Sequence, residues 1–478
     1  MSTSRLICIL CLLGLLGACA PREWLLPRLG MEPPALRDFP EDFEPPLSSE
    51  TEQPMVGFGG GGGGVTRTPV IFVHGNTVSA RYWLPARRHF LEAGYTPDEL
   101  WAPGYGWDNV RYFDSADLSV RSLDRFVTAV LRYLSEKSGR EIHQVDIIGH
   151  SLGVTLVRQW MKQENAYHKV RNFIGACGAN DGVWTAASDT RGQNRVVAYE
   201  LYPGSPWLEQ LNRGGETPGP TRYMTLYDGT GWGDVLFPRP FEHSSALEGA
   251  YNLAYNVENG TWYDHLELPR VPGPMDAMIR FLRAAGEPIP NSGPPQLVQD
   301  GSTLRAEPAE ATVHCAANGL DPTHATRGLA QVDLRSGSLL SCYARNARTG
   351  MASPLARFQW SAAAPAPEPL SLRAEPAGGV FEQPQQVRLT ASDPRAFIVY
   401  TTSGSPPDSG SPLYRKPVYV AAPLTLTAMA IAPDGRRSEP LTLEFDISLE
   451  LINANRTLQR QFDDSVPAAY AGKRKKGN

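Results

Sequence analysis

Apolar runs alternate with helix-like periodicity through the first half of the chain. Residues 70–73 and 145–148 are almost entirely apolar, as is typical of strands covered on both faces. The stretches "VRNFIGACGA" and "TRYMTLYDG" predict two further strands, and residues 123–134 carry apolar side chains at helical spacing. Strands that alternate with helices predict a mostly parallel sheet within an α/β domain.

The same pattern gives this domain its expected limits, residues 67–286. "YNLAYNV" predicts its last strand, and "DAMIRFLRAAG", from Asp276, predicts its closing helix. Upstream, residues 19–66 are rich in proline and acids and include six consecutive glycines. A segment of this composition buries little apolar surface, so we expect a flexible tether there.

Beyond residue 286 the pattern changes to short alternating segments separated by turn residues. Such segments predict small β-sandwich modules, and we expect one at residues 294–362 and another at residues 371–448. The sequence "SAAAPAPEP" lies between them and has the composition of a linker. Residues 449–478 are expected to form a tail.

Composition limits the function classes. The chain has 478 residues, of which 41% are hydrophobic and 20% charged, as in ordinary globular proteins. Its net charge is −5, and its one run of four basic residues, 473–476, lies in the expected tail. A chain of this charge gathers no polyanion, so nucleic acid is not an expected partner.

The N-terminus predicts export. Arg5 precedes an apolar run that is too short to span a bilayer, so residues 1–18 read as a signal peptide. The run ends in Leu-Gly-Ala-Cys, which resembles the bacterial lipobox. The resemblance implies a lipid on Cys19 and anchoring to a bacterial membrane, the outer one if the cell has one, since Ala20 follows. Plain secretion is the alternative.

Export changes how the cysteines are interpreted. In an oxidising compartment Cys315 and Cys342 make a plausible disulfide within the first β module. Cys177 lies in a strand-like stretch without metal-ligand spacing around it, so we expect a buried thiol. The sequence predicts no metal site and no cofactor.

The stretch "VDIIGHSLGV" holds the candidate catalytic nucleophile. Its Gly-His-Ser-Leu-Gly pentapeptide follows an expected buried strand and precedes an expected helix, the context in which a Gly-x-Ser-x-Gly serine acts as a nucleophile. Ser151 would then need a later acid and histidine. Of the nine histidines, His243 and His265 fit that order, and His265 fits better because it follows the last strand.

The sequence offers three candidates for the acid. "YMTLYDGTGWGDVLFP" offers Asp228 at the end of a strand and Asp234 in the loop after it. A triad acid is normally presented from such a loop, so Asp234 is the first choice, with Asp228 and Asp181 as alternatives.

The oxyanion hole needs two backbone N–H groups aimed at the developing charge. The residue after the nucleophile, Leu152, supplies one. "VHGN" follows an early strand, and the Asn76 amide is the expected second donor.

With these parts placed, residues 68–282 resemble the bacterial class 2 lipases, a family of small α/β-hydrolases. The resemblance rests on "PVIFVHGN", "GYTPDELWAPGYG", "VDIIGHSLGV", "GDVLFP", "SALEGAYN" and "DHLEL", in that order. It implies the roles given above to Ser151, Asp234 and His265. The chain departs from the family at Asn76, where the small lipases carry an apolar residue, and at Gly149, where alanine is common. "FIVYTTSGSPPDSGSPLYRKPVYV" resembles the chitobiase/hexosaminidase-type C-terminal module of secreted hydrolases. This resemblance implies an immunoglobulin-like β-sandwich.

These features together predict an exported, lipid-anchored serine hydrolase that cleaves carboxylic esters through an acyl-enzyme. A polyhydroxyalkanoate depolymerase, a non-catalytic surface-binding lipoprotein, and an amidase or acyltransferase are the alternatives. The β modules would bind a polymer or glycan surface, or act as spacers. Residues 181–221 would form a lid, an acyl-binding wall or ordinary packing, through the aromatic and apolar residues Trp184, Tyr199, Tyr202, Trp207 and Leu208.

Overall fold

The computed structural model describes most of the chain between residues 36 and 447. It leaves out residues 77, 106–115, 184–199, 202, 204, 230–233, 235, 238–241, 256–264, 285–292, 318–319, 335–338, 360–368, 383–384, 403, 409–410, 412, 415–416, 421–422 and 433–435. The expected signal peptide, Cys19 and the expected tail therefore lie outside the described residues.

The first domain is built on an eight-stranded sheet in the order β1-β2-β4-β3-β5-β6-β7-β8. Every neighbouring pair is parallel except β2 with β4, so the predicted mostly parallel sheet is confirmed. The central strands are fully buried because helices and loops cover both faces. The strands are β1 (Arg37–Asp38), β2 (Val56–Gly59), β3 (Val70–Val73), β4 (Leu100–Gly104), β5 (Val145–His150), β6 (Val170–Ala176), β7 (Arg222–Tyr227) and β8 (Tyr251–Ala254).

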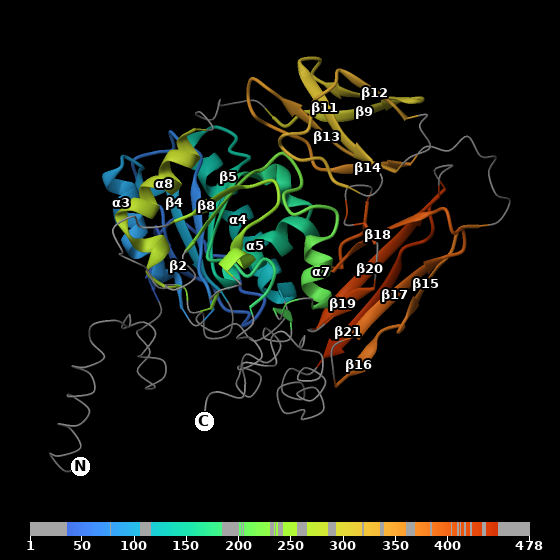
Figure 1. Ribbon diagram of the computed structural model, residues 1–478, viewed down its shortest axis with the longest axis horizontal. Helices are drawn as coiled ribbons and strands as arrows, with labels where there is room; N and C mark the ends of the chain where they lie inside the picture. Colours follow the sequence, from blue (N-terminus) through green and yellow to red (C-terminus); the bar gives the residue numbers. More distant parts are fainter. Residues whose placement is uncertain are drawn as a thin grey trace, which may run out of the picture.

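Two pairs of packed helices accompany the sheet, α3 with α8 and α4 with α5 (Figure 1). The helix predicted from Asp276 begins earlier, at Pro272, because prolines are tolerated in a first helical turn, where no amide hydrogen is needed. The helices are α3 (Leu84–Glu92), α4 (Ala116–Ser138), α5 (Leu152–Gln163), α7 (Pro206–Asn212) and α8 (Pro272–Arg283).

The prediction of a flexible tether is wrong for residues 36–66. Strands β1 and β2 extend the sheet at its edge, and Phe43 and Phe58 are buried in the main core. Phe43 lies against Trp101, with ring centroids 4.9 Å apart, and against Tyr133 at 5.3 Å. Proline- and acid-rich composition hid these few aromatic contacts, which are enough to anchor the segment.

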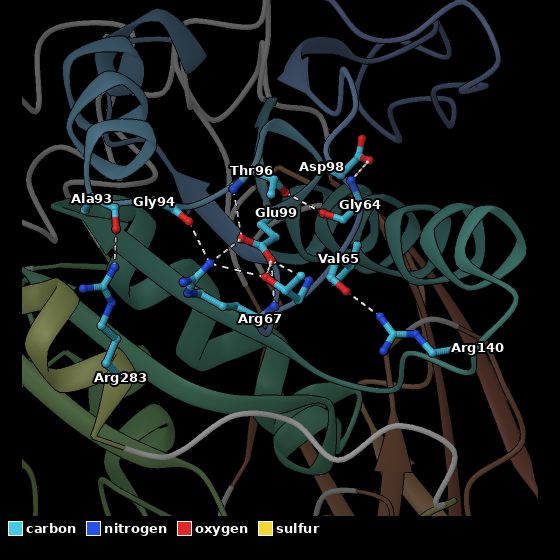
Figure 2. Close-up of polar contacts among 11 residues, drawn as sticks. Gly64, Val65, Arg67, Ala93, Gly94, Thr96, Asp98, Glu99, Arg140 and Arg283 are labelled. Carbon is cyan, nitrogen blue, oxygen red and sulfur yellow. Dashed lines mark hydrogen bonds and ion pairs between the residues drawn. The ribbon is translucent and has the colours of Figure 1, made fainter.

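Two buried carboxylates hold the glycine-rich stretch that follows β2 (Figure 2). Asp98 accepts hydrogen bonds from the backbone N–H groups of Gly62 and Gly64 at 2.9 and 3.0 Å. Glu99 accepts from the backbone of Thr66 and Arg67, both at 2.6 Å. Charge-assisted bonds of this kind are stronger than neutral ones. Gly62 and Gly64 both have positive φ, which glycine adopts without strain. The glycines therefore allow a fixed backbone conformation here rather than conferring flexibility.

The first β module consists of two three-stranded sheets, β12-β10-β9 and β11-β13-β14. Cys315 and Cys342 lie directly opposite each other on β11 and β13, and the predicted disulfide between them is confirmed. The small buried cluster of this module explains why a covalent link is useful. Its strands are β9 (Gln296–Asp300), β10 (Thr303–Glu307), β11 (Ala311–Ala317), β12 (Gln331–Asp333), β13 (Leu339–Asn346) and β14 (Ala356–Gln359).

The second β module pairs a three-stranded sheet, β15-β17-β19, with a four-stranded sheet, β16-β21-β20-β18. Alternating burial along β17 matches one inward and one outward face. The predicted β-sandwich architecture is thus confirmed. Its strands are β15 (Leu372–Glu375), β16 (Gly379–Phe381), β17 (Gln385–Ala391), β18 (Phe397–Thr401), β19 (Val418–Val420), β20 (Leu424–Ile431) and β21 (Leu441–Ile447).

Both modules contact the α/β domain. The backbone N–H of Gly219 donates to Pro322 of the first module at 2.7 Å. Gln210 on α7 donates to the Tyr400 hydroxyl of the second module at 2.6 Å, and Figure 1 shows α7 facing the strands of that module. In the part of the chain described, no helix combines the length and apolarity needed to cross a membrane.

Candidate active site

Ser151 occupies a sharp turn between β5 and α5. Its backbone has φ 53° and ψ −124°, a conformation that costs an L-residue energy and that clusters at functional sites. Its N–H donates to the Ala176 carbonyl at 2.9 Å, and its carbonyl accepts from Val154 at 3.0 Å. The turn places the serine at the carboxyl edge of the sheet, where the first amide of α5, that of Leu152, follows directly.

The predicted oxyanion turn lies against this serine. A β-carbon on Gly75 would lie 2.9 Å from Cβ of Ser151, and one on Gly153 would lie 2.5 Å from the His74 carbonyl oxygen. Only glycine fits such close backbone approaches. Asn76, the next residue of the turn, is half-buried. The turn that carries the Asn76 amide is therefore held beside Ser151.

Neutral His74 stiffens the same turn. Its ring stacks on Tyr105 with centroids 4.1 Å apart, and burial lowers the pKa of His74 to about 4. Nδ1 donates to the Gly75 carbonyl at 2.8 Å, while Nε2 accepts from the Tyr105 N–H at 3.3 Å. With both nitrogens occupied in this way, a single tautomer fits.

His265 and Asp234 are hydrogen-bonded to each other. The His265 Nδ1 atom lies 2.9 Å from Oδ2 and 3.1 Å from Oδ1 of Asp234, and both residues are buried. A carboxylate can only accept, so Nδ1 carries the proton and Nε2 keeps its lone pair. Nε2 is buried and has no hydrogen-bond partner among the described residues. This is the orientation that a general base requires.

The alternative acids occupy other places. Asp228 is buried at the end of β7, and its Oδ2 lies 3.4 Å from the backbone N of Asp234, so it supports the loop that carries Asp234. Asp181 follows β6, and its N–H donates to the Ser244 carbonyl at 3.2 Å. The side chain of His243 lies outside the described residues.

His150, which precedes Ser151 in the chain, is a neighbour of the site. Its ring stacks on Tyr82 at 4.7 Å, and its Nε2 donates to the His265 carbonyl at 2.8 Å. Burial, and then the neighbouring His265, hold the pKa of His150 well below its usual range. The ring is therefore neutral, and it braces the backbone of His265.

The expected lid segment is described only in part. Trp184, Tyr199 and Tyr202 lie outside the described residues. Trp207 and Leu208 are buried on α7, which begins after Ser205, whose hydroxyl accepts from the Leu208 N–H at 3.1 Å. These two side chains belong to ordinary packing.

The α/β domain is similar in sequence to a known protein family. Residues 67–228 match the family model described as lipase (class 2). Over these residues the α/β domain is similar to the class 2 lipases. This domain type implies carboxylic ester hydrolysis, with an ester or lipid as substrate. The match ends at Asp228, so the places of Asp234 and His265 in the lipase domain rest on geometry alone.

A second family model, chitobiase/beta-hexosaminidase C-terminal domain, matches residues 376–442. This range lies within the second β module, so both resemblances noted in the sequence are confirmed. No curated protein shows significant similarity to the chain.

Solved structures to which the chain is similar include several lipolytic enzymes. The mature form of Bacillus licheniformis lipase BlEst2 is 18% identical with a TM-score of 0.36, covering 45% of this chain and 92% of that one. Its propeptide form is 14% identical with a TM-score of 0.35, covering 79% and 93%. Phospholipase PlaB from Legionella pneumophila is 14% identical with a TM-score of 0.33, covering 59% and 86%. Likenesses this distant carry no information on the substrate.

Proposed function

We propose that the chain is a serine esterase or lipase that works through Ser151, His265 and Asp234. The observation that carries the proposal is the hydrogen bond between His265 Nδ1 and the Asp234 carboxylate, 2.9 Å long. It leaves the second nitrogen of a buried imidazole without a hydrogen-bond partner among the described residues, at the sheet edge where Ser151 follows β5. The order serine, acid, histidine along the chain supports the same three residues.

The chemistry follows from the arrangement. His265 Nε2 takes the hydroxyl proton of Ser151 while Oγ attacks the ester carbonyl. The Leu152 and Asn76 amides stabilise the oxyanion of the tetrahedral intermediate, and Asp234 stabilises the imidazolium that forms. His265 returns the proton to the leaving alkoxide, which leaves an acyl group on Ser151. Water, activated by the same imidazole, then releases the acid.

The direct test uses p-nitrophenyl esters of graded chain length and a fluorophosphonate probe. We expect Ser151→Ala to lower the turnover number by about 10⁴-fold or more and to abolish labelling by the probe. Ser138→Ala, a serine at the end of α4 remote from the site, is the matched control and should behave as the unaltered protein. Full activity of Ser151→Ala would exclude the proposed nucleophile. The response to chain length separates a lipase from a short-chain esterase, and release of hydroxyalkanoate from polymer granules would identify a depolymerase.

We also propose that the chain is exported and anchored through lipid on Cys19. The support is the apolar segment that ends in Leu-Gly-Ala-Cys. Radiolabelled palmitate should be incorporated into the unaltered chain and not into Cys19→Ala. The variant should then appear in the soluble fraction, whereas a palmitate-labelled Cys19→Ala would contradict this anchor.

For the second β module we propose attachment to an insoluble polymer or glycan. The match of residues 376–442 to a module of chitobiase and hexosaminidase supports this idea. Co-sedimentation of the full chain with chitin, and with polyester granules as a second solid, tests it. The absence of the chain from both pellets would leave the module as a spacer.

A further inference from the structure

Ser151 and Cys177 stand at equivalent ends of two neighbouring strands. In the register of β5 and β6, His150 is paired with Ala176, so each of these residues is the first after its strand. Both have positive φ, 53° for Ser151 and 52° for Cys177. The proposed mechanism uses the serine and leaves the buried thiol without a role.

The thiol is part of a cluster with the two buried histidines of the site. One ring nitrogen of His150, one of His265, and Sγ of Cys177 all lie within 4.8 Å of one another. All three residues are buried, with exposed fractions of 1%, 7% and 0%. They are far apart in the sequence and converge only because the strand ends meet at one edge of the sheet.

Both imidazoles keep a lone pair available. His150 Nε2 donates to the His265 carbonyl and His265 Nδ1 donates to Asp234. The remaining nitrogens, His150 Nδ1 and His265 Nε2, are buried without a hydrogen-bond partner among the described residues. Histidines that bind metals characteristically donate their second N–H to a carboxylate or a backbone carbonyl, as these two do.

The charge and the size of the cluster also suit a divalent ion. A Cys177 thiolate and the Asp234 carboxylate together offset two positive charges. Thiolate and imidazole ligands select zinc and related soft ions. Tetrahedral Zn²⁺ holds such ligand atoms about 3.4–3.6 Å apart, so the cluster has to contract by roughly 1 Å, which small side-chain rotations provide.

We propose that His150, His265 and Cys177 form an inhibitory site for Zn²⁺ or Cd²⁺. The ion bonds to Sγ, whose proton is released to water, and to the two nitrogen lone pairs. The lone pair of His265 is then unavailable to take the proton of Ser151, so hydrolysis stops until a chelator removes the ion. The inhibitory effect rests on the proposed function, whereas metal binding does not.

Inhibition of the full chain by Zn²⁺ tests the effect on catalysis. We expect Zn²⁺ to inhibit hydrolysis of a soluble p-nitrophenyl ester, and EDTA to restore the rate. Cys177→Ala should keep its metal-free activity and need at least about ten times more Zn²⁺ for half-inhibition. His143→Gln, at a surface histidine, is the control and should leave inhibition unchanged. Equal inhibition of Cys177→Ala and the unaltered chain would overturn the proposal.

Titration with Cd²⁺ detects metal binding independently of ester hydrolysis. A thiolate-to-Cd²⁺ absorption band should appear in the unaltered chain and in Ser151→Ala, and should be lost in Cys177→Ala. If the unaltered chain proves to hydrolyse no ester, the band still reports whether the metal site exists. A band of equal size in Cys177→Ala would exclude it. Cys177→Ser, with nearly the same volume, replaces the alanine variant if the latter does not fold.

Discussion

His150 donates a hydrogen bond from Nε2 to the backbone carbonyl of His265, over 2.8 Å. The residue that precedes the candidate nucleophile therefore holds the residue that carries the candidate base. The bond joins β5 to a loop 115 positions later in the chain. Stacking on Tyr82 fixes the ring that donates it.

Replacing His150 tests this brace. His150→Phe keeps a flat ring against Tyr82 but has no donor, and we expect its turnover number to fall about tenfold, the worth of one hydrogen bond of 1–2 kcal/mol. The Michaelis constant should change little, because the residue positions the base rather than the substrate. His150→Gln can still donate from Nε2 and should recover most of the rate. A Gln variant as slow as the Phe variant would contradict the positioning role.

The identity of the acid is tested at Asp234. Asp234→Asn keeps the shape of the side chain but removes the charge that orients and stabilises His265, so we expect the turnover number to fall by about 10⁴-fold. Asp228→Asn is the matched control. Its amide oxygen can still accept from the Asp234 N–H, as the carboxylate does, so its rate should stay within a few-fold of normal. A larger loss of turnover in Asp228→Asn than in Asp234→Asn would assign the role of the catalytic acid to Asp228.

Residues 36–66, the N-terminal arm of the α/β domain, should stabilise that domain. Phe43→Ala removes a ring that is 5% exposed and packs against Trp101 and Tyr133. We expect the free energy of unfolding of the α/β domain to fall by about 3–4 kcal/mol, measured by urea denaturation. Glu44→Ala changes an exposed neighbour and should have little effect. If both variants unfold at the same urea concentration, the arm does not stabilise the domain.

Asp146 predicts a dependence of stability on pH. Burial raises its pKa from 3.8 to about 7, against the opposing effects of Arg171 and of hydrogen bonds from Asn172. The folded state therefore holds a proton that the unfolded state loses above pH 3.8, and this group makes stability fall as the pH rises from about 4 to 7. Asp146→Asn removes that slope, so its stability relative to the unaltered chain should increase over this range.

Calorimetry at several pH values between 4 and 7 measures the effect. Asp124→Asn, a partly exposed aspartate on α4, is the control and should leave the slope in place. An unchanged slope in Asp146→Asn would show that the carboxyl is already ionised in the folded protein.

Much of the fold could be read from the chain because its signals are local. Apolar runs marked the buried strands β3 and β5, and the pentapeptide around Ser151 predicted the turn between strand and helix. The order of serine, acid and histidine narrowed the candidates to a few residues. The spacing of turn residues predicted the sandwich modules. These features depend on side-chain periodicity or on short spacing, which a sequence displays directly. The disulfide was predicted differently, from the expected oxidising compartment and the few cysteines that remain after export.

The tertiary structure alone decided what depends on contacts between distant segments. It placed residues 36–66 in the sheet and core, because a few aromatic rings and the amides bound by Asp98 and Glu99 outweigh an unpromising composition. It set Asp234 rather than Asp228 on His265. It also gathered His150, Cys177 and His265 at one sheet edge, since parallel strands bring their carboxyl ends together however far apart they lie in the chain.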